Sequence, residues 1–146
     1  MHSLLQTHVD IHILLIQEPW FYTVATIHSN NNPEGTPQKG LPHNDRWDAH
    51  LPKHTLTDMC KVTIYTHKML LKTHKVKLHT NHCLANLTTM VLNITNAEGS
   101  TLHIINIYHT VPQWGHGLHY LLTHTLDETT PTLLMGDLNT HDLWWS

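Results

Sequence analysis

The stretch Thr88-Thr-Met-Val-Leu-Asn-Ile-Thr-Asn-Ala-Glu-Gly-Ser-Thr-Leu-His-Ile-Ile-Asn-Ile-Tyr108 decides the fold class. Its two halves, 88–95 and 101–108, are rich in β-branched and apolar residues, which favour β-strands. The segment between them, Asn96-Ala-Glu-Gly99, has the composition of a tight turn. This stretch therefore predicts a β-hairpin.

Outward from this hairpin, the same reasoning predicts further strands and flanking helices. We expect a buried strand at 10–17 and further strands at 61–66 and 132–135, the last running into Gly136 and Asp137. Leucines at helical spacing predict a helix at 117–126, and residues 1–8 fit the last turns of another helix with Leu4 and Leu5 inward. Four of the seven prolines fall within 29–53, which predicts a long ordered loop. Strands dominate, so the predicted class is a β-rich α/β (α+β) sandwich.

The composition limits the kinds of protein this chain can be. With 146 residues it has room for one domain, and 40% hydrophobic against 13% charged residues argues against disorder. A net charge of −3 is unlike a strongly basic nucleic-acid binder, and no apolar run is long enough to cross a membrane. The beginning of the chain does not resemble a signal peptide. We therefore expect an intracellular protein of the nucleus or cytoplasm that is not secreted.

Histidine is the unusual residue, with 17 copies against a single arginine, Arg46. Repeated G-to-A changes in codons convert arginine to histidine, so one hypothesis is that the gene has decayed and left a non-catalytic remnant or an interaction protein. A second hypothesis is a histidine-rich metal-binding protein, because pairs at short spacing can share zinc. Such groups are His79, His82 and Cys83, and His116 with His119. With this many histidines, chance also produces such pairs.

Polar side chains stand where three of the predicted strands end. Glu18 follows the apolar run 13–16, and a carboxylate held there can bind a hard cation such as Mg²⁺. Its simpler interpretation is that it only marks the strand end. Asn106 and Tyr108 are two residues apart and so face the same side of their strand, where an amide and a phenol can donate to phosphate oxygens. The simpler interpretation of Asn106 is a core amide that bonds the backbone.

The third strand end has the sequence Gly136-Asp-Leu-Asn139. The glycine permits a tight turn that brings Asp137 and Asn139 together. The carboxylate could orient a water or a proton donor, and the amide could hold a phosphate oxygen. Sequences of this kind also occur in ordinary turns.

Taken in order, these motifs resemble the endonuclease/exonuclease/phosphatase superfamily, the group of DNase I and the AP endonucleases. The resemblance is closest to endonuclease domains of non-LTR retrotransposons and extends from about Asp10 to Trp145. The stretches that carry it are Leu15-Ile-Gln-Glu-Pro-Trp20, Gly40-Leu-Pro-His-Asn-Asp-Arg-Trp-Asp48, Ile105-Asn-Ile-Tyr108 and Gly136-Asp-Leu-Asn-Thr-His-Asp-Leu-Trp-Trp145. It implies a four-layer α-β-β-α sandwich with mostly antiparallel sheets.

The resemblance also implies a role for each candidate residue. Glu18 would ligate a catalytic Mg²⁺, with Mn²⁺ as a possible substitute. Asp137 would position the attacking water or the leaving group, and Asn139 would hold the scissile phosphate. Tyr108 would contact that phosphate with support from Asn106. The implied reaction is hydrolysis of a DNA phosphodiester, with DNA as the partner and no membrane involved. A structural role is expected for His141.

The chain also departs from the family pattern. Members of the family end with further strands and a Ser-Asp-His whose histidine activates the water, and no Ser-Asp-His occurs here. We therefore expect residues 1–146 to be one domain that is incomplete at both ends, with little stability for its size. Because a general base commonly contributes about 10²–10⁴-fold, we expect no measurable nicking of DNA. A lipid or sugar phosphatase is the alternative within the superfamily.

Overall fold

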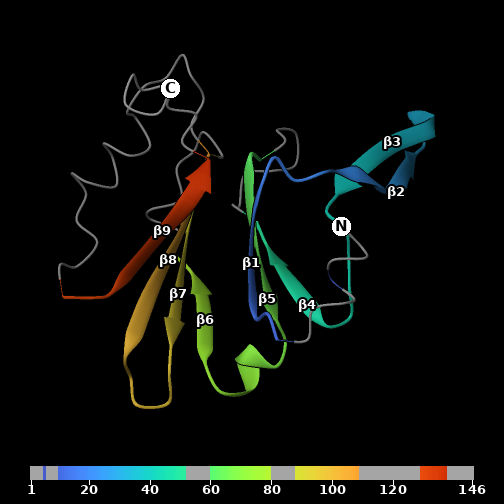
Figure 1. Cartoon of the computed structure of the whole chain (residues 1–146). Coiled ribbons are helices and arrows are strands. Elements are labelled where there is room, and N and C mark those ends of the chain that lie inside the picture. The colour runs from blue at the N-terminus through green and yellow to red at the C-terminus, as the bar shows by residue number, and fades with distance from the viewer. Residues whose placement is uncertain (1–4, 6–9, 52–59, 80–87, 109–128, 138–146) are drawn as a thin grey trace, which may run out of the picture.

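The computed structural model describes Leu5 and residues 10–51, 60–79, 88–108 and 129–137. Figure 1 shows two β-sheets facing each other, with a separate two-stranded hairpin at one side. Within the described residues, no helix is both long and apolar enough to cross a membrane.

The two facing sheets differ in their strand direction. In the first sheet the order is β1-β5-β4 and both pairs are antiparallel. In the second sheet the order is β6-β7-β8-β9, and here β8 and β9 run parallel while the other pairs are antiparallel. The strands are β1 (Ile13–Gln17), β4 (Trp47–His50), β5 (Val62–His67), β6 (Lys75–Leu78), β7 (Thr89–Thr95), β8 (Thr101–Tyr108) and β9 (Thr132–Asp137).

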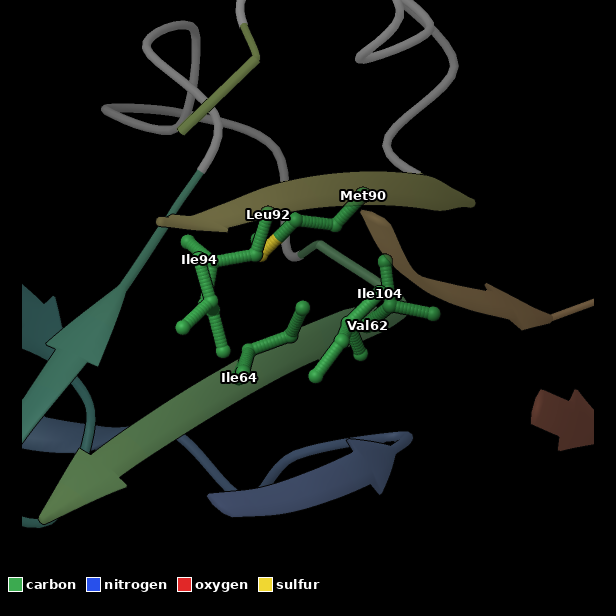
Figure 2. Packing of buried hydrophobic residues seen from close by; sticks show 6 residues of the cluster. All are labelled: Val62, Ile64, Met90, Leu92, Ile94 and Ile104. Atoms are coloured by element: carbon green, nitrogen blue, oxygen red, sulfur yellow. The ribbon is translucent and has the colours of Figure 1, made fainter. Parts of the chain in front are cut away.

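The core lies between these sheets because alternate residues of each strand face the partner sheet. From β5, Val62 and Ile64 point toward alternate residues of β7 and toward Ile104 of β8, as Figure 2 shows. All of these side chains are buried. The same alternation on β8 directs Asn106 and Tyr108 toward β1, and this places the polar site residues beside the core.

The outer faces of both sheets also bury apolar side chains. On the first sheet, Trp47 and Tyr65 pack with Leu41 and with Leu5, a residue in helical conformation. The indole N–H of Trp47 donates to the carbonyl oxygen of Leu5 at 3.0 Å. On the second sheet, a cluster of Val91, Ile105 and Ile107 is buried on the face turned away from the core. The strands β5, β7 and β8 are therefore buried on both faces along most of their length, which explains their long apolar runs.

Five of the predicted strands are confirmed, at β1, β5, β7, β8 and β9. The predicted turn between β7 and β8 is confirmed as well, since the side chain of Asn96 accepts from the N–H groups of Glu98 and Ser100. Gly99 in this turn has a φ of 86°, a conformation that glycine adopts without strain.

The predicted loop over 29–53 is wrong. This region contains β4 and most of a hairpin formed by β2 (Tyr22–Ser29) and β3 (Asn32–Gly40). Pro33 and Pro37 are tolerated in β3 because this strand pairs with β2 on one side only. Among the described strands, none on its other side needs the N–H groups that proline lacks. A further strand that the sequence analysis missed is β6, where Val76 and Leu78 pack against the core.

The expected sandwich is found in its two β layers, with mostly antiparallel pairing. The helical layers of the predicted four-layer arrangement are not confirmed. Within the described residues, helical structure is limited to Leu5 and the single turn η1 (Leu70–Lys72). The helix predicted over 117–126 lies outside the described residues.

Candidate active site

Four strand ends meet at one edge of the two sheets, the upper edge in Figure 1. Because β1 and β5 are antiparallel with Gln17 opposite Val62, the end of β1 lies beside the start of β5. Because β8 and β9 are parallel with Tyr108 opposite Asp137, these two strands end together. The topology thus brings Glu18, Lys61, Tyr108 and Asp137 to the same edge.

Asn106 joins the two sheets directly beneath this edge. Its amide nitrogen donates to the carbonyl oxygens of Ile16 at 3.0 Å and Thr63 at 2.9 Å, on two strands of the opposite sheet. Its amide oxygen accepts from the side chain of Gln17 at 2.6 Å. Asn106 is fully buried. These contacts fit the interpretation of a core amide that bonds the backbone, and they fix the end of β1 relative to β8.

Glu18 is held in an uncommon backbone conformation at the end of β1. Its φ of 47° lies in the left-handed region, which a residue other than glycine adopts only where the surroundings fix it. Its N–H donates to the carbonyl oxygen of Lys61 at 2.7 Å, which supplies that constraint. The carboxylate is therefore presented from a pinned backbone rather than from a free loop.

The carboxylate of Glu18 is surrounded by groups that favour its ionised form. The ammonium of Lys61 donates to Oε1 at 3.0 Å. Hydrogen bonds from Lys61 and then from Tyr108 lower the pKa of Glu18 below its ordinary value. Both members of the ion pair are about half exposed, with 44% of Lys61 and 56% of Glu18 accessible to solvent. The carboxylate is thus charged at neutral pH and open to an incoming cation.

Lys61 is the site residue that the sequence analysis missed. In the structure the ammonium of Lys61 forms an ion pair with Glu18. It also lies 5.6 Å from the centre of the Tyr108 ring. Pairing the two predicted strands could have identified Lys61. In the antiparallel pair of β1 and β5, Gln17 lies opposite Val62, so the next residues outward, Glu18 and Lys61, also lie opposite each other.

Asp137 ends β9 beside Tyr108, and its side chain is exposed. Gly136 precedes it with a φ of 155°, and a Cβ on this residue would overlap the carbonyl oxygen of Ile107. Only glycine therefore lets β9 approach β8 this closely. Asn139 and His141 lie outside the described residues, so their predicted roles stay predictions.

The donor set at this edge suits a hard cation. Carboxylates are the protein ligands that Mg²⁺ prefers, and it commonly uses one or two of them with water. Glu18 already holds one positive group, the ammonium of Lys61, so its oxygens are oriented toward a cation. Among the described residues, no group of three or more histidine, cysteine, aspartate or glutamate side chains could hold a metal ion. Of the histidine and cysteine groups considered for zinc, only His79 is described.

The model of the Endonuclease/Exonuclease/phosphatase family matches residues 1–146. Neither the curated proteins nor the solved structures contain a match to this chain.

Proposed function

The chain belongs to the endonuclease/exonuclease/phosphatase family, and from this premise we propose that the edge carrying Glu18, Tyr108 and Asp137 binds a phosphodiester of DNA beside a divalent cation. The family performs hydrolysis of the nuclease or phosphatase type, and its members typically depend on a divalent metal. The reaction proposed here is Mg²⁺-dependent hydrolysis of a DNA phosphodiester. Mn²⁺ is a possible substitute for Mg²⁺.

The observation that carries this proposal is the group formed by Glu18, Lys61 and Tyr108. An ionised carboxylate, an ammonium and a phenol converge there from β1, the start of β5 and the end of β8. A carboxylate can hold a cation, while an ammonium and a phenol can donate to phosphate oxygens. One small edge therefore offers both kinds of group that phosphoryl chemistry requires.

Each candidate residue has a role in this proposal. Glu18 is the ligand for the metal, which supplies stabilisation of the charge on the phosphoryl oxygens. Asp137 orients the attacking water or the leaving group. Tyr108 donates to the phosphate, and Asn139 holds it. Asn106 does not touch the phosphate in this scheme, because its amide bonds Ile16, Thr63 and Gln17; it positions Tyr108 and the end of β1.

In this proposal the side chain of Lys61 has two positions, one on Glu18 and one on the phosphate. Without a metal, its ammonium neutralises Glu18. A divalent cation held by Glu18 would repel the ammonium of Lys61, and the long lysine side chain could then donate to the phosphate. Lys61 therefore keeps Glu18 ionised and ordered until both cation and substrate arrive.

The choice of DNA, and of a retrotransposon-type endonuclease, rests on the order of the motifs around Glu18, Tyr108 and Gly136. A DNA substrate would also place the protein in the nucleus or the cytoplasm.

The experiment measures binding of a labelled DNA duplex by fluorescence anisotropy, with Mg²⁺ and with a chelator. We expect Mg²⁺ to strengthen binding by the wild-type chain, and Glu18→Gln to weaken this Mg²⁺-dependent part by at least about tenfold. The matched control is Glu98→Gln, at an exposed glutamate in the turn between β7 and β8, which should behave as wild type.

Equal binding with and without Mg²⁺ would contradict the proposal, as would a Glu98→Gln effect as large as that of Glu18→Gln. Turnover is measured separately as relaxation of a supercoiled plasmid. Relaxed circles that disappear in Asn139→Ala would show a working nuclease and overturn the expectation that this chain lacks activity.

A further inference from the structure

Two aromatic residues, Trp20 and Tyr22, follow the site residue Glu18 closely in the chain. Trp20 follows Glu18 by two residues and is 70% exposed, more than any other large hydrophobic residue in the described part of the chain. Its ring lies 6.0 Å from the ring of Tyr22, centre to centre, at an angle of 31°. An exposed tryptophan forgoes a large gain from burial, and Trp20 is not an isolated case because its ring pairs with a second aromatic ring.

The exposure of Trp20 is built into the backbone. Glu18 is pinned by its hydrogen bond to Lys61, and the residue after it, Pro19, is buried. On the other side, Tyr22 is half-buried and begins the ladder of the β2–β3 hairpin opposite Gly40. Trp20 is thus held between two fixed points, with its ring in solvent against the partly buried ring of Tyr22.

The distance to Glu18 is short enough for one ligand to reach both places. Two residues of extended chain span at most about 7 Å between Cα atoms. The atoms next to a phosphate bound at Tyr108, beside the metal ligand Glu18, are therefore within reach of Trp20. A flat, unpaired nucleobase fits this position, because its face can stack on the indole.

We propose that Trp20, supported by Tyr22, is a stacking platform for an unpaired nucleobase next to the phosphate that Tyr108 binds beside the metal ligand Glu18. This inference rests on the proposed function and deepens it, since it selects a nucleic-acid strand over a sugar or lipid phosphate. A base inside a duplex has both faces stacked, so the platform acts on single-stranded or locally opened DNA. A protein partner is a poorer occupant, because two rings offer far less than the roughly 800 Å² that each side of a stable interface buries.

The experiment compares two single-stranded DNA probes of equal length in the presence of Mg²⁺. One carries thymine at every position and the other carries abasic sites, so both present the same number of phosphates. Binding is measured by fluorescence anisotropy for the wild type, Trp20→Ala, Trp20→Phe and the control Ile27→Ala, which removes a side chain 52% exposed further along β2. Circular dichroism establishes that each variant is folded.

We expect the wild type to prefer the thymine strand by about 5- to 150-fold for one stacked base. Trp20→Ala should lose this preference while its affinity for the abasic strand stays unchanged. Trp20→Phe should retain part of the preference, and Ile27→Ala all of it. A duplex of the same sequence should bind less tightly than the thymine strand.

Three results would overturn the platform while leaving the proposed phosphate site intact. These are equal wild-type affinity for the thymine and abasic strands, an unchanged preference in Trp20→Ala, and a duplex that binds as tightly as the single strand. If the wild type binds none of the probes, the proposed function itself fails and the platform fails with it. The abasic strand therefore separates the two failures.

Discussion

At the scale of single residues, the site depends on the ion pair between Glu18 and Lys61. The Nζ–Oε1 distance is 3.0 Å, and the hydrogen bond from Lys61 is the largest cause of the lowered pKa of Glu18. Because both side chains are half exposed, the pair adds little to the stability of the fold. Its effect is on the charge and orientation of the carboxylate.

Replacing Lys61 with methionine should raise the pKa of Glu18 toward its ordinary value. The pKa of Glu18 is lower in the folded than in the unfolded chain, so the ion pair stabilises the fold at pH values above the unfolded pKa. This stabilisation is lost as the pH falls through the folded pKa. In Lys61→Met, less stability should be lost as the pH falls through this range. The measurement is a ¹³C NMR titration of the side-chain carboxyl of Glu18.

The matched control for this titration is Lys68→Met. Lys68 is exposed to a similar extent, 47% against 44%, and it pairs with Asp48 rather than with Glu18. The pKa of Glu18 should not move in this variant. An unchanged pKa in Lys61→Met would mean that the ion pair does not govern the charge of the carboxylate.

Asn106 should matter more for stability than any exposed polar residue of the site. Asn106→Ala removes three hydrogen bonds between the sheets and leaves buried backbone carbonyl groups without that partner. We expect a loss of about 2–4 kcal/mol in the free energy of unfolding, measured by urea denaturation.

Asn93→Ala on the neighbouring strand β7 is the control for this loss. The side-chain oxygen of Asn93 has no hydrogen-bond partner within the part of the chain that the structure describes. Its replacement should cost less than about 1 kcal/mol. Equal losses in the two variants would rule out the link between the sheets as the cause.

At the scale of elements, the parallel pair β8–β9 places Asp137 beside Tyr108 through the close approach at Gly136. In Gly136→Ala the new methyl group would collide with the carbonyl oxygen of Ile107. We expect β9 to move away from β8, at a cost of about 1–3 kcal/mol in unfolding free energy, together with weaker Mg²⁺-dependent DNA binding.

Gly99→Ala tests whether space or backbone conformation causes this effect. Gly99 has a φ of 86° and nothing within 4 Å of an added Cβ. The control should therefore show only a small loss of stability from backbone strain and normal DNA binding. If both variants lose DNA binding to the same degree, the close approach of the two strands is not what places Asp137.

The elements also show where local sequence patterns fail. The strands β5, β7 and β8 were predictable because buried, β-branched runs are a local signal. The β2–β3 hairpin was not, since its prolines and exposed polar residues imitate a loop, and only pairing across the hairpin makes it a strand pair. The strand-end positions of Glu18, Tyr108 and Asp137 were predictable from local patterns, whereas the contact of Lys61 with Glu18 depends on how two distant strands pair.

At the scale of the whole molecule, β9 forms an edge of the second sheet among the described strands. Leu133, Leu134 and Met135 on this strand are between 41% and 50% exposed. An apolar strand at a sheet edge is a template for pairing with another chain. We expect the protein to self-associate as its concentration rises.

A charge on this edge should reduce the association. Leu134→Lys is expected to lower the concentration dependence of light scattering while leaving the unfolding free energy nearly unchanged. Met69→Lys serves as the control, because Met69 is 51% exposed but lies outside the strands. Association that is unaffected by Leu134→Lys, or reduced equally by Met69→Lys, would show that β9 is not the contact.

The sequence by itself determined the strand-rich class, the β7–β8 hairpin and the shared face of Asn106 and Tyr108. These follow from alternation and turn chemistry, which act over a few residues. Only the tertiary structure decided that Lys61 binds Glu18, 43 residues away, and that Gln17 binds Asn106, 89 residues away. The physical reason is that strand register and sheet packing set these contacts, and both depend on how the whole core fits together.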